Sequence, residues 1–263
     1  MEETVTLLHG FTLTGESWEE LVRNMPAGWR WVTPDVRGHG GAKTAPCTMD
    51  DCAADLVALW DHLGVERSHV VGYSMGGRLA LHVAVRLPER TRSLLTIGAH
   101  PGLDPEAREA RRRADEALAQ EIERDGIEPF ARYWESLPMF AGITRRGPEF
   151  AAWLHSLRVS NRPAGLAASL RGMGAGAMEP LWGELGVIHV PTTFVAGDQD
   201  SAFIAVALRM AEHVRDWRLR TVPDSGHAAH FEQPEAMAGI LADHLRWAAA
   251  AAAGTAGSSS TTD

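Results

Sequence analysis

The 263-residue sequence predicts an α/β protein with a mostly parallel central sheet, helices on both of its faces and an inserted helical segment. Three observations predict this fold class. Short apolar runs alternate with segments of helical periodicity over the first hundred residues and again near the end. A Gly-x-Ser-x-Gly motif at 72–76 joins one apolar run directly to a helical segment. Between residues 100 and 185 the alternation stops, and helical periodicity continues without a convincing strand.

Each element follows from periodicity, turn residues or caps. The β-branched and apolar runs are short enough for strands that are buried on both faces. The helical segments place apolar residues at spacings of three and four, and Thr48 with Asp51 resembles a capping box at one helix start. We expect strands at 5–8, 29–32, 68–72, 93–97, 192–196 and 217–222, and helices at 17–25, from 48, at 75–87, at 202–213 and from 234.

The break in the alternation divides the chain into parts. We expect residues 1–99 and 186–253 to form the core and residues 100–185 to form a helical insertion. Ligands of open α/β sheets bind outside the carboxyl ends of the strands, so an insertion at that edge would act as a lid. The Gly-, Ser- and Thr-rich segment 254–263 is predicted to be a disordered tail.

Charge and composition exclude several function classes. The formal net charge of −9 disfavours nucleic acid and anionic membrane surfaces as partners. No apolar run reaches the roughly 18 residues of a membrane span, and the acidic start of the chain does not resemble a signal peptide. Cys47 and Cys52 form neither a disulfide framework nor a zinc pattern. We expect a cytoplasmic protein with structural thiols and no metal.

The serine of the Gly-x-Ser-x-Gly motif needs partners to be reactive. A serine hydroxyl becomes a useful nucleophile or base beside an imidazole, whose tautomer is held by a third group. With this motif the partners follow the serine in the order acid, then histidine. After Ser74, one predicted strand ends in a loop with Asp200, and the next ends in a loop with His227. We expect these three residues to form a catalytic triad.

Other residues compete for the acid and base positions. Asp198 lies closer to the end of its strand, Asp224 lies closer in sequence to the histidine, and His230 follows three residues after His227. We prefer Asp200 because the acid usually lies a few residues past the strand. We prefer His227 because the glycine before it suits a loop that carries an imidazole over the sheet edge.

Backbone N–H groups beside the serine could bind a developing oxyanion. Met75 follows Ser74 at a predicted helix N-terminus, where the helix dipole favours negative charge. Phe11 follows His9-Gly10 at the end of the first predicted strand, at the same sheet edge. We expect the amides of Phe11 and Met75 to form the oxyanion hole.

Arginine supplies every basic residue except Lys43, and two arginines occupy unusual positions. Arg78 lies one helical turn after Ser74, where a guanidinium is costly unless it meets an anion. Arg158 lies among apolar neighbours that suggest partial burial. The run at 108–113 is best explained as a solvated helix face, although one member could point inward. Such arginines favour an anionic small molecule as the ligand.

The residues described so far resemble a known family. The chain resembles α/β-hydrolase-fold proteins at 9–11, 72–77, Asp200 and 226–227. Within that fold it resembles the 2-succinyl-6-hydroxy-2,4-cyclohexadiene-1-carboxylate synthase family, the pyruvate-eliminating lyases of menaquinone biosynthesis. The closer resemblance covers nearly the whole chain except the tail and rests on 72–78, 98–103, 108–115, 133–134, 138–141, 157–161 and 197–201.

The resemblance implies roles for particular residues and an activity. The triad is again Ser74, Asp200 and His227, and the implied substrate site is lined by Tyr73, Arg78, Arg111, Trp134 and Arg158. Arg111 is placed by aligning its helix, and a shorter preceding connection leaves Arg108 or Arg112 as alternatives. The implied reaction is elimination of pyruvate from 2-succinyl-5-enolpyruvyl-6-hydroxy-3-cyclohexene-1-carboxylate, a small polycarboxylate, without a cofactor or metal.

Two other function classes stay open at this point. The same triad could hydrolyse a small anionic substrate through an acyl-enzyme, as a carboxylesterase or a C–C bond hydrolase. The fold could also serve a non-catalytic binding protein, although an intact triad argues against this. In the lyase interpretation, Ser74 acts as a base rather than as a nucleophile. The sequence does not predict an oligomeric state.

Overall fold

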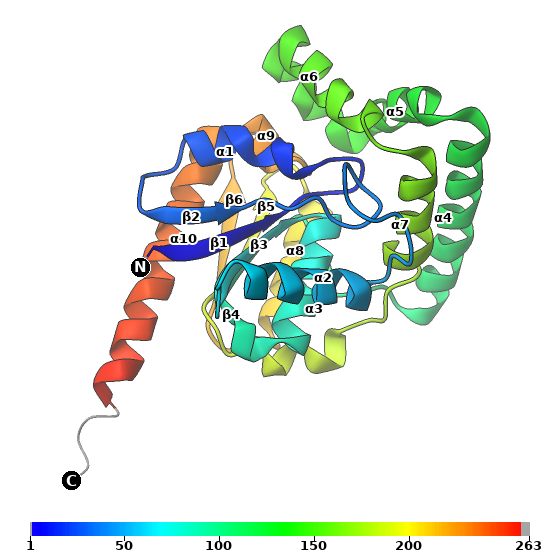
Figure 1. Ribbon diagram of the computed structural model, residues 1–263. Helices are drawn as coiled ribbons and strands as arrows, with labels where there is room; N and C mark the ends of the chain where they lie inside the picture. The colour runs from blue at the N-terminus through cyan, green and yellow to red at the C-terminus, as the bar shows by residue number, and fades with distance from the viewer. Residues whose placement is uncertain (1, 259–263) are drawn as a thin grey trace.

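Six parallel strands form the centre of the computed structural model, which describes residues 2–258 and, for 254–258, the backbone alone (Figure 1). Their order across the sheet is β2-β1-β3-β4-β5-β6. The strands are β1 (Glu3–Leu8), β2 (Trp29–Val32), β3 (Ser68–Tyr73), β4 (Thr91–Ile97), β5 (Thr192–Gly197) and β6 (Trp217–Val222). The predicted α/β fold is therefore confirmed, with small shifts at the strand ends.

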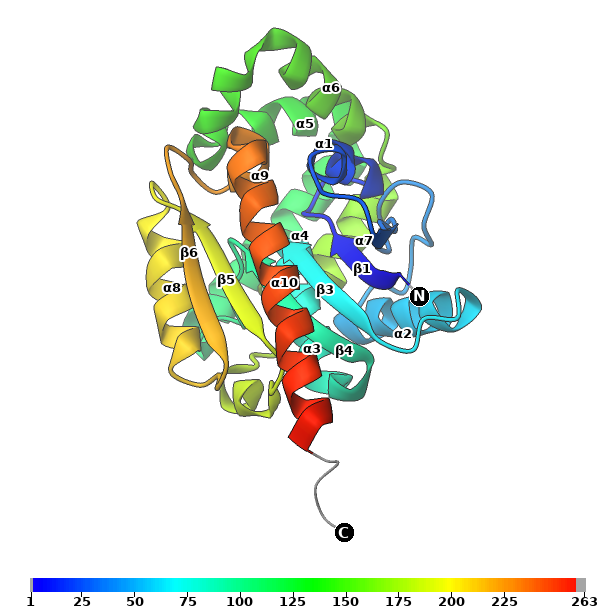
Figure 2. The same cartoon turned by 90° about the vertical axis from the view of Figure 1, so that its left-hand side faces the viewer.

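The strands at the centre of the sheet contribute side chains to two separate cores. Because successive side chains of a strand point to opposite faces, Val70 and Leu94 lie in one apolar cluster while Val71 and Leu95 lie in the other. Figure 2 views the sheet from the side that α10 covers. The first cluster is covered by α2 (Met49–His62), α3 (Met75–Arg86) and α8 (Ser201–Ala211), and the second by α1 (Glu19–Arg23) and α10 (Pro234–Ser258).

The ends of two helices show how local sequence sets their limits. At the start of α2, Thr48 Oγ1 accepts from the Asp51 amide and the Asp51 carboxylate accepts from the Thr48 amide, both at 3.1 Å, which confirms the predicted capping box. Helix α10 continues to Ser258, so the tail that we predicted from Gly254 begins as helix. The preceding alanine run has the highest helix propensity and carries the helix onward. Residues 259–263 of that predicted tail lie outside the described residues.

Helices replace strands between β4 and β5. The described residues of this segment contain no strand, and helices α4 to α7 lie over the edge where the strands end (Figure 1). The last part of the segment returns to the opposite edge, where Glu184 of η4 pairs with Arg86 at the end of α3. Ala119, Ile122, Leu166 and Leu170 pack together in an apolar cluster of their own. The segment comprises α4 (Pro105–Asp125), α5 (Ile127–Glu135), η3 (Pro138–Arg146), α6 (Gly147–Val159), α7 (Pro163–Met173) and η4 (Trp182–Val187), the two η elements being 3₁₀ helices. No helix in the described part of the chain is both long and apolar enough to cross a membrane.

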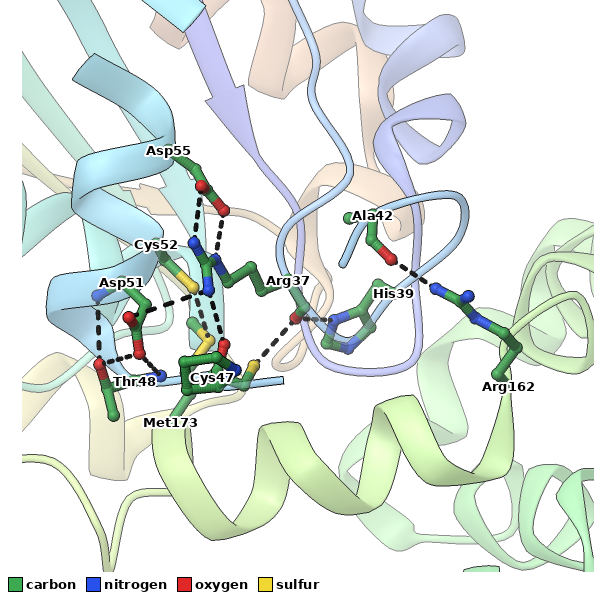
Figure 3. Close-up of polar contacts among 11 residues, drawn as sticks. Arg37, His39, Ala42, Cys47, Thr48, Asp51, Cys52, Asp55, Arg162 and Met173 are labelled. Atoms are coloured by element: carbon green, nitrogen blue, oxygen red, sulfur yellow. Dashed lines mark hydrogen bonds and ion pairs between the residues drawn. The ribbon is translucent and has the colours of Figure 1, made fainter. Parts of the chain in front are cut away.

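The base of α7 rests on the glycine-rich turn after β2. Gly38, with φ 83°, approaches α7 so closely that a Cβ would lie 2.5 Å from the Gly165 carbonyl oxygen. Figure 3 shows Arg162 at the start of α7 donating to the Ala42 carbonyl of the same turn. Only glycine fits at this contact, because any side chain would push the helix away from the turn.

Two cysteines lie where α7 meets α2. Cys47 and Cys52 are buried and free, and the Cys52 thiol donates to the Met173 sulfur at 3.2 Å (Figure 3). The Cys47 thiol donates to the Arg37 carbonyl, also at 3.2 Å. Both thiols therefore contribute packing and local hydrogen bonds.

Several buried histidines are held neutral by their surroundings. His9 is fully buried, and its Nε2 accepts from the Val36 amide at 2.9 Å while its Nδ1 donates to the Gly10 carbonyl at 2.9 Å. Protonation would place a hydrogen between Nε2 and the Val36 N–H. Burial lowers the pKa of His9 from 6.5 to about 4, and it lowers the pKa of His230 and of His244 to about 3.

We predict that acid destabilises the fold through these histidines. Below about pH 6.5 the unfolded chain binds protons that the native rings do not, so the free energy of unfolding should fall as the pH drops toward 4. His9 alone should contribute a loss on the order of 3 kcal/mol at pH 4. Denaturant unfolding between pH 7 and 4.5 would measure most of this loss, since ordinary carboxylates titrate mostly below that range. A constant free energy across this range would contradict the prediction.

Candidate active site

The turn between β3 and α3 holds Ser74 in a strained backbone conformation. Ser74 has φ 51° and ψ −109°, and its amide donates to the Ile97 carbonyl at 2.8 Å. The glycines of the motif leave no space for side chains: a Cβ on Gly72 would lie 2.1 Å from the Gly76 carbonyl oxygen, and one on Gly76 would lie 2.1 Å from the Leu8 carbonyl oxygen. This close packing of β1, β3 and α3 fixes the serine hydroxyl at the sheet edge.

The three predicted triad residues lie in hydrogen-bond contact. His227 Nε2 is 3.2 Å from Ser74 Oγ, and His227 Nδ1 is 3.0 Å from Asp200 Oδ2. Asp200 is the N-cap residue of α8 and lies directly after the β5 turn. With Nδ1–H donating to the carboxylate, Nε2 is left as the acceptor of the serine hydroxyl. The arrangement can therefore raise the basicity and nucleophilicity of Ser74.

The competing acids and histidine have different contacts. Asp198 accepts from the backbone amides of Asp224 at 3.1 Å and Ser225 at 3.2 Å, so its carboxylate joins the two loops behind the triad. Asp224 occupies a turn with φ 50°. His230 is buried against the Tyr73 ring, with the ring centroids 4.2 Å apart. None of these side chains is hydrogen-bonded to Ser74 or His227 among the described residues.

Two backbone amides beside the serine have no acceptor within the described part of the chain. Met75 is the first residue of α3, so its N–H has no partner inside the helix. Phe11 lies in the turn after β1, and its ring contacts Trp134 with centroids 5.3 Å apart. These are the two amides that we expect to bind an oxyanion.

A cavity of about 650 Å³ opens beside the serine hydroxyl. Core residues after the strand ends line one side of it, and the inserted helices line the other. Of the predicted site residues, Asp200 lies behind His227 and does not line the cavity. The lining includes Phe11, Tyr73, Ser74, Met75, Arg78, Arg111, Trp134, Arg158 and His227.

Arg78 is a buried cation without a carboxylate in ion-pair distance among the described residues. It is 8% exposed, and its Nη1 donates to the Met173 carbonyl at 2.8 Å. Burial, together with the nearby positive charge of Arg111, lowers the pKa of Arg78 from 12.5 to about 10. The guanidinium nonetheless stays charged at neutral pH. Arg78 lines the cavity, and its Nε and Nη2 groups have no hydrogen-bond partner among the described residues.

The inserted helix α4 presents one arginine to the cavity. Arg111 lines the cavity, and its Nε donates at 2.7 Å to Asp115, which is buried and has one oxygen without a partner. Arg108 instead donates to Glu179 at 3.0 Å and to two backbone carbonyls, and neither Arg108 nor Arg112 lines the cavity. Of the three arginines that the resemblance allows, Arg111 is therefore the one that lines the cavity.

Arg158 reaches the cavity from α6. It is 3% exposed, its Nη1 lies 3.3 Å from a Glu135 oxygen, and its Nε has no partner. Burial lowers the pKa of Arg158, and the charge of Glu135 opposes this shift. Its guanidinium also lies over the Phe140 ring, 5.9 Å from the centroid. Burial raises the pKa of Tyr73 well above its usual range, so the phenol is a neutral group of the wall.

The sequence indicates no role for several polar residues of this site, among them His100, Asp115 and Glu135. His100 and Asp115 line the cavity, and Glu135 pairs with Arg158. His100 follows β4 at its carboxyl end, and the rule that placed Asp200 and His227 could have indicated it. Asp115 and Glu135 had no comparable signal, because acidic residues on a charged helix usually face solvent.

Comparisons with known proteins place the chain among its relatives. A family model described as the alpha/beta hydrolase fold matches residues 3–234. A 2-succinyl-6-hydroxy-2,4-cyclohexadiene-1-carboxylate synthase of Klebsiella pneumoniae is 33% identical over 92% of this chain and 93% of its own length. A Bacillus subtilis protein that carries the same name provisionally is 36% identical over 92% and 90%.

Two solved structures are also similar to this chain over most of its length. MenH from S. aureus superposes with a TM-score of 0.88 at 28% identity and covers 94% of this chain and 95% of its own. A thermophilic esterase from Thermogutta terrifontis, with malate bound, superposes with a TM-score of 0.80 at 29% identity and covers 94% and 90%.

We predict that Ser74 is the residue that reacts with a fluorophosphonate, a reagent for activated serines. Ser74→Ala should abolish labelling. Asp200→Asn should slow it on the order of 10² to 10⁴-fold, because the imidazole loses the carboxylate that holds its tautomer. Asp198→Asn is the matched control in the same loop and should stay within several-fold of the unchanged protein. Mass spectrometry of the labelled peptide measures the rate, and a larger effect of Asp198→Asn would reassign the acid.

Proposed function

The chain belongs to the alpha/beta hydrolase fold family and, within it, to the 2-succinyl-6-hydroxy-2,4-cyclohexadiene-1-carboxylate synthases, and we propose that it is a carbon–oxygen lyase of menaquinone biosynthesis. It eliminates pyruvate from 2-succinyl-5-enolpyruvyl-6-hydroxy-3-cyclohexene-1-carboxylate. The catalytic residues in this proposal are Ser74, His227 and Asp200. The amides of Phe11 and Met75 form the oxyanion hole.

The observation that carries the proposal is the positive charge of the cavity. Arg78 is buried beside the serine without a carboxylate in ion-pair distance among the described residues, and Arg111 and Arg158 line the same cavity from two inserted helices. Asp115 and Glu135 pair with Arg111 and Arg158, but the buried guanidinium of Arg78 has no such partner among the described residues, so an anionic ligand would offset the cost of burying its charge. The ring, the succinyl group and the enolpyruvyl group of the substrate each bear one carboxylate, which matches this set.

The substrate and product names define the bond changes. The substrate has one ring double bond at position 3, and the product has two at positions 2 and 4. The proton at carbon 2 must leave, its electron pair must form the 2,3 double bond, and the old pair must shift to carbons 4 and 5. That shift breaks the carbon–oxygen bond at carbon 5 and releases enolpyruvate, which takes up a proton and becomes pyruvate.

The triad supplies the base for the first step. Ser74 Oγ takes the proton from carbon 2 while its own hydroxyl proton moves to His227 Nε2, which lies 3.2 Å away. Asp200 stabilises the resulting imidazolium through Nδ1 at 3.0 Å. The imidazolium of His227 then gives this proton to the departing enolpyruvate, which becomes pyruvate. Ser74 acts as a base in this sequence, and no acyl-enzyme forms.

The oxyanion hole has a defined task in this reaction. Carbon 2 lies next to the succinyl carbonyl, so the negative charge that develops on proton loss is delocalised onto that carbonyl oxygen. The free amides of Phe11 and Met75 can donate to it, and the N-terminus of α3 adds a favourable dipole. The chain's own residues thus provide both the base and the stabilisation of charge.

We propose further that the protein has a core with a helical lid and lies in the cytoplasm. The core comprises 1–99 and 186–253, and the helical insertion 100–185 acts as a lid that excludes water from the cavity, which it lines on one side. The substrate is a small molecule. A cytoplasmic location fits the free thiols of Cys47 and Cys52.

A hydrolase is the second candidate, because the same triad could attack an ester through an acyl-enzyme. The likeness to the Thermogutta terrifontis esterase at 29% identity favours it. Arg78 disfavours only a neutral ester, which would give the buried guanidinium no partner, so release of pyruvate is the measurement that separates the lyase from a hydrolase of anionic esters.

We predict that the protein releases pyruvate from the enolpyruvyl substrate and that Ser74→Ala lowers kcat by 10³-fold or more, because the base is lost. A coupled lactate dehydrogenase assay measures the pyruvate, and the same mixture without the protein is the blank. Absence of pyruvate together with rapid cleavage of a nitrophenyl ester would contradict the lyase and support the hydrolase.

We also predict that Arg78→Ala lowers kcat/KM. The loss of transition-state stabilisation should be on the order of 2 to 5 kcal/mol, because a desolvated carboxylate of the substrate loses its partner. Arg113→Ala is the matched control, since this α4 arginine is exposed and pairs with Glu109 on the surface. It should change kcat/KM by less than about 0.5 kcal/mol. Equal effects of the two substitutions in the pyruvate assay would remove Arg78 from the substrate site.

A further inference from the structure

His100 is a cavity residue whose hydrogen bonds determine its protonation state. Its Nδ1 accepts from the Gly102 amide at 3.1 Å. A backbone N–H can only donate, so Nδ1 carries no proton, and the proton of the neutral ring must lie on Nε2. Burial, together with the nearby positive charges of Arg78 and Arg111, lowers the pKa of His100 from 6.5 to about 3. The ring is therefore a neutral donor throughout the physiological range.

The Nε2–H of His100 is free to meet a ligand. It has no hydrogen-bond partner among the described residues, and it is not one of the fully enclosed polar atoms of the protein. The ring lines the cavity that also contains Ser74 and Arg78. The Nε2–H donor is therefore available to a ligand in this cavity.

The turn that carries His100 is held in place by residues 180–182, near the end of the inserted segment. The Pro101 carbonyl accepts from the Leu181 amide at 2.7 Å, and the Gly102 carbonyl accepts from the Trp182 indole at 3.1 Å. Gly102 has φ 128°, and a Cβ there would lie 2.5 Å from the Pro180 Cα. The imidazole is consequently oriented before any ligand binds, which lowers the entropic cost of using it.

We propose that His100 is a substrate-binding residue whose Nε2–H donates to the carboxylate oxygen that also meets Arg78 and Arg111. This inference rests on the proposed function. A neutral donor adds a charge-assisted hydrogen bond to the carboxylate without adding a positive charge near His227, which must stay a good proton acceptor. Neutral imidazole donors serve other enzymes in this way.

Two amide substitutions separate this role from a structural one. In His100→Asn, the side-chain oxygen can replace Nδ1 as the acceptor of the Gly102 N–H, but no donor remains at the Nε2 position. In His100→Gln, the longer side chain places an N–H near the Nε2 position. A structural role predicts that Asn is the better replacement, whereas substrate binding predicts that Gln is better.

We expect His100→Asn to lose 10- to 100-fold in kcat/KM for pyruvate release, mainly through a higher KM, because the charge of the bound carboxylate is the same throughout the reaction. His100→Gln should stay within about fivefold of the unchanged protein. Thermal unfolding of both variants checks that they fold.

Three results would overturn the proposal. Pyruvate release by the unchanged protein with an equal rate in His100→Asn would remove His100 from substrate binding and leave the proposed function intact. A larger loss in His100→Gln than in His100→Asn would make His100 a structural residue only. Absence of pyruvate from the unchanged protein would overturn the proposed function, and this inference with it.

Discussion

The steric contact among β1, β3 and α3 is the constraint on which the rest of the site depends. At Gly72 and Gly76 the backbones approach so closely that no Cβ fits, and this packing holds Ser74 at a positive φ. The serine hydroxyl is therefore presented by backbone geometry and needs no side-chain support of its own. Because the strands are parallel, their carboxyl ends bring the Asp200 and His227 loops to the same edge. A strained turn and a parallel sheet together produce a triad from residues far apart in sequence.

Electrostatics inside the cavity differ from those of the whole protein. The chain is acidic, yet Arg78, Arg111 and Arg158 face one apolar space. Asp115 and Glu135 balance two of these charges, while Arg78 has backbone and sulfur partners only among the described residues. A buried cation that lacks an anion is costly to the folded protein. In the proposed function the same arrangement favours a polycarboxylate, since the ligand would supply the missing charge.

Backbone amides also set the tautomers of two buried histidines. The Val36 amide donates to His9, and the Gly102 amide donates to His100, so a main-chain N–H decides in each case which ring nitrogen carries the proton. At His227 a carboxylate has this task, and it also stabilises the charged ring. Neutral and chargeable imidazoles thus occupy neighbouring positions of one fold, with roles set by what faces Nδ1 or Nε2.

The sequence by itself determined the alternation of strands and helices, the insertion and the loops that carry Ser74, Asp200 and His227, because periodicity, glycine turns and chain order are local properties. Tertiary structure decided which polar side chains share the cavity. Arg111 faces inward while Arg108 binds Glu179, and the difference depends on where α4 packs rather than on the residues themselves. The tautomer of His100 likewise depends on a backbone amide two residues away whose direction only the folded turn defines. Contacts across elements are set by packing, and a single sequence contains no direct record of them.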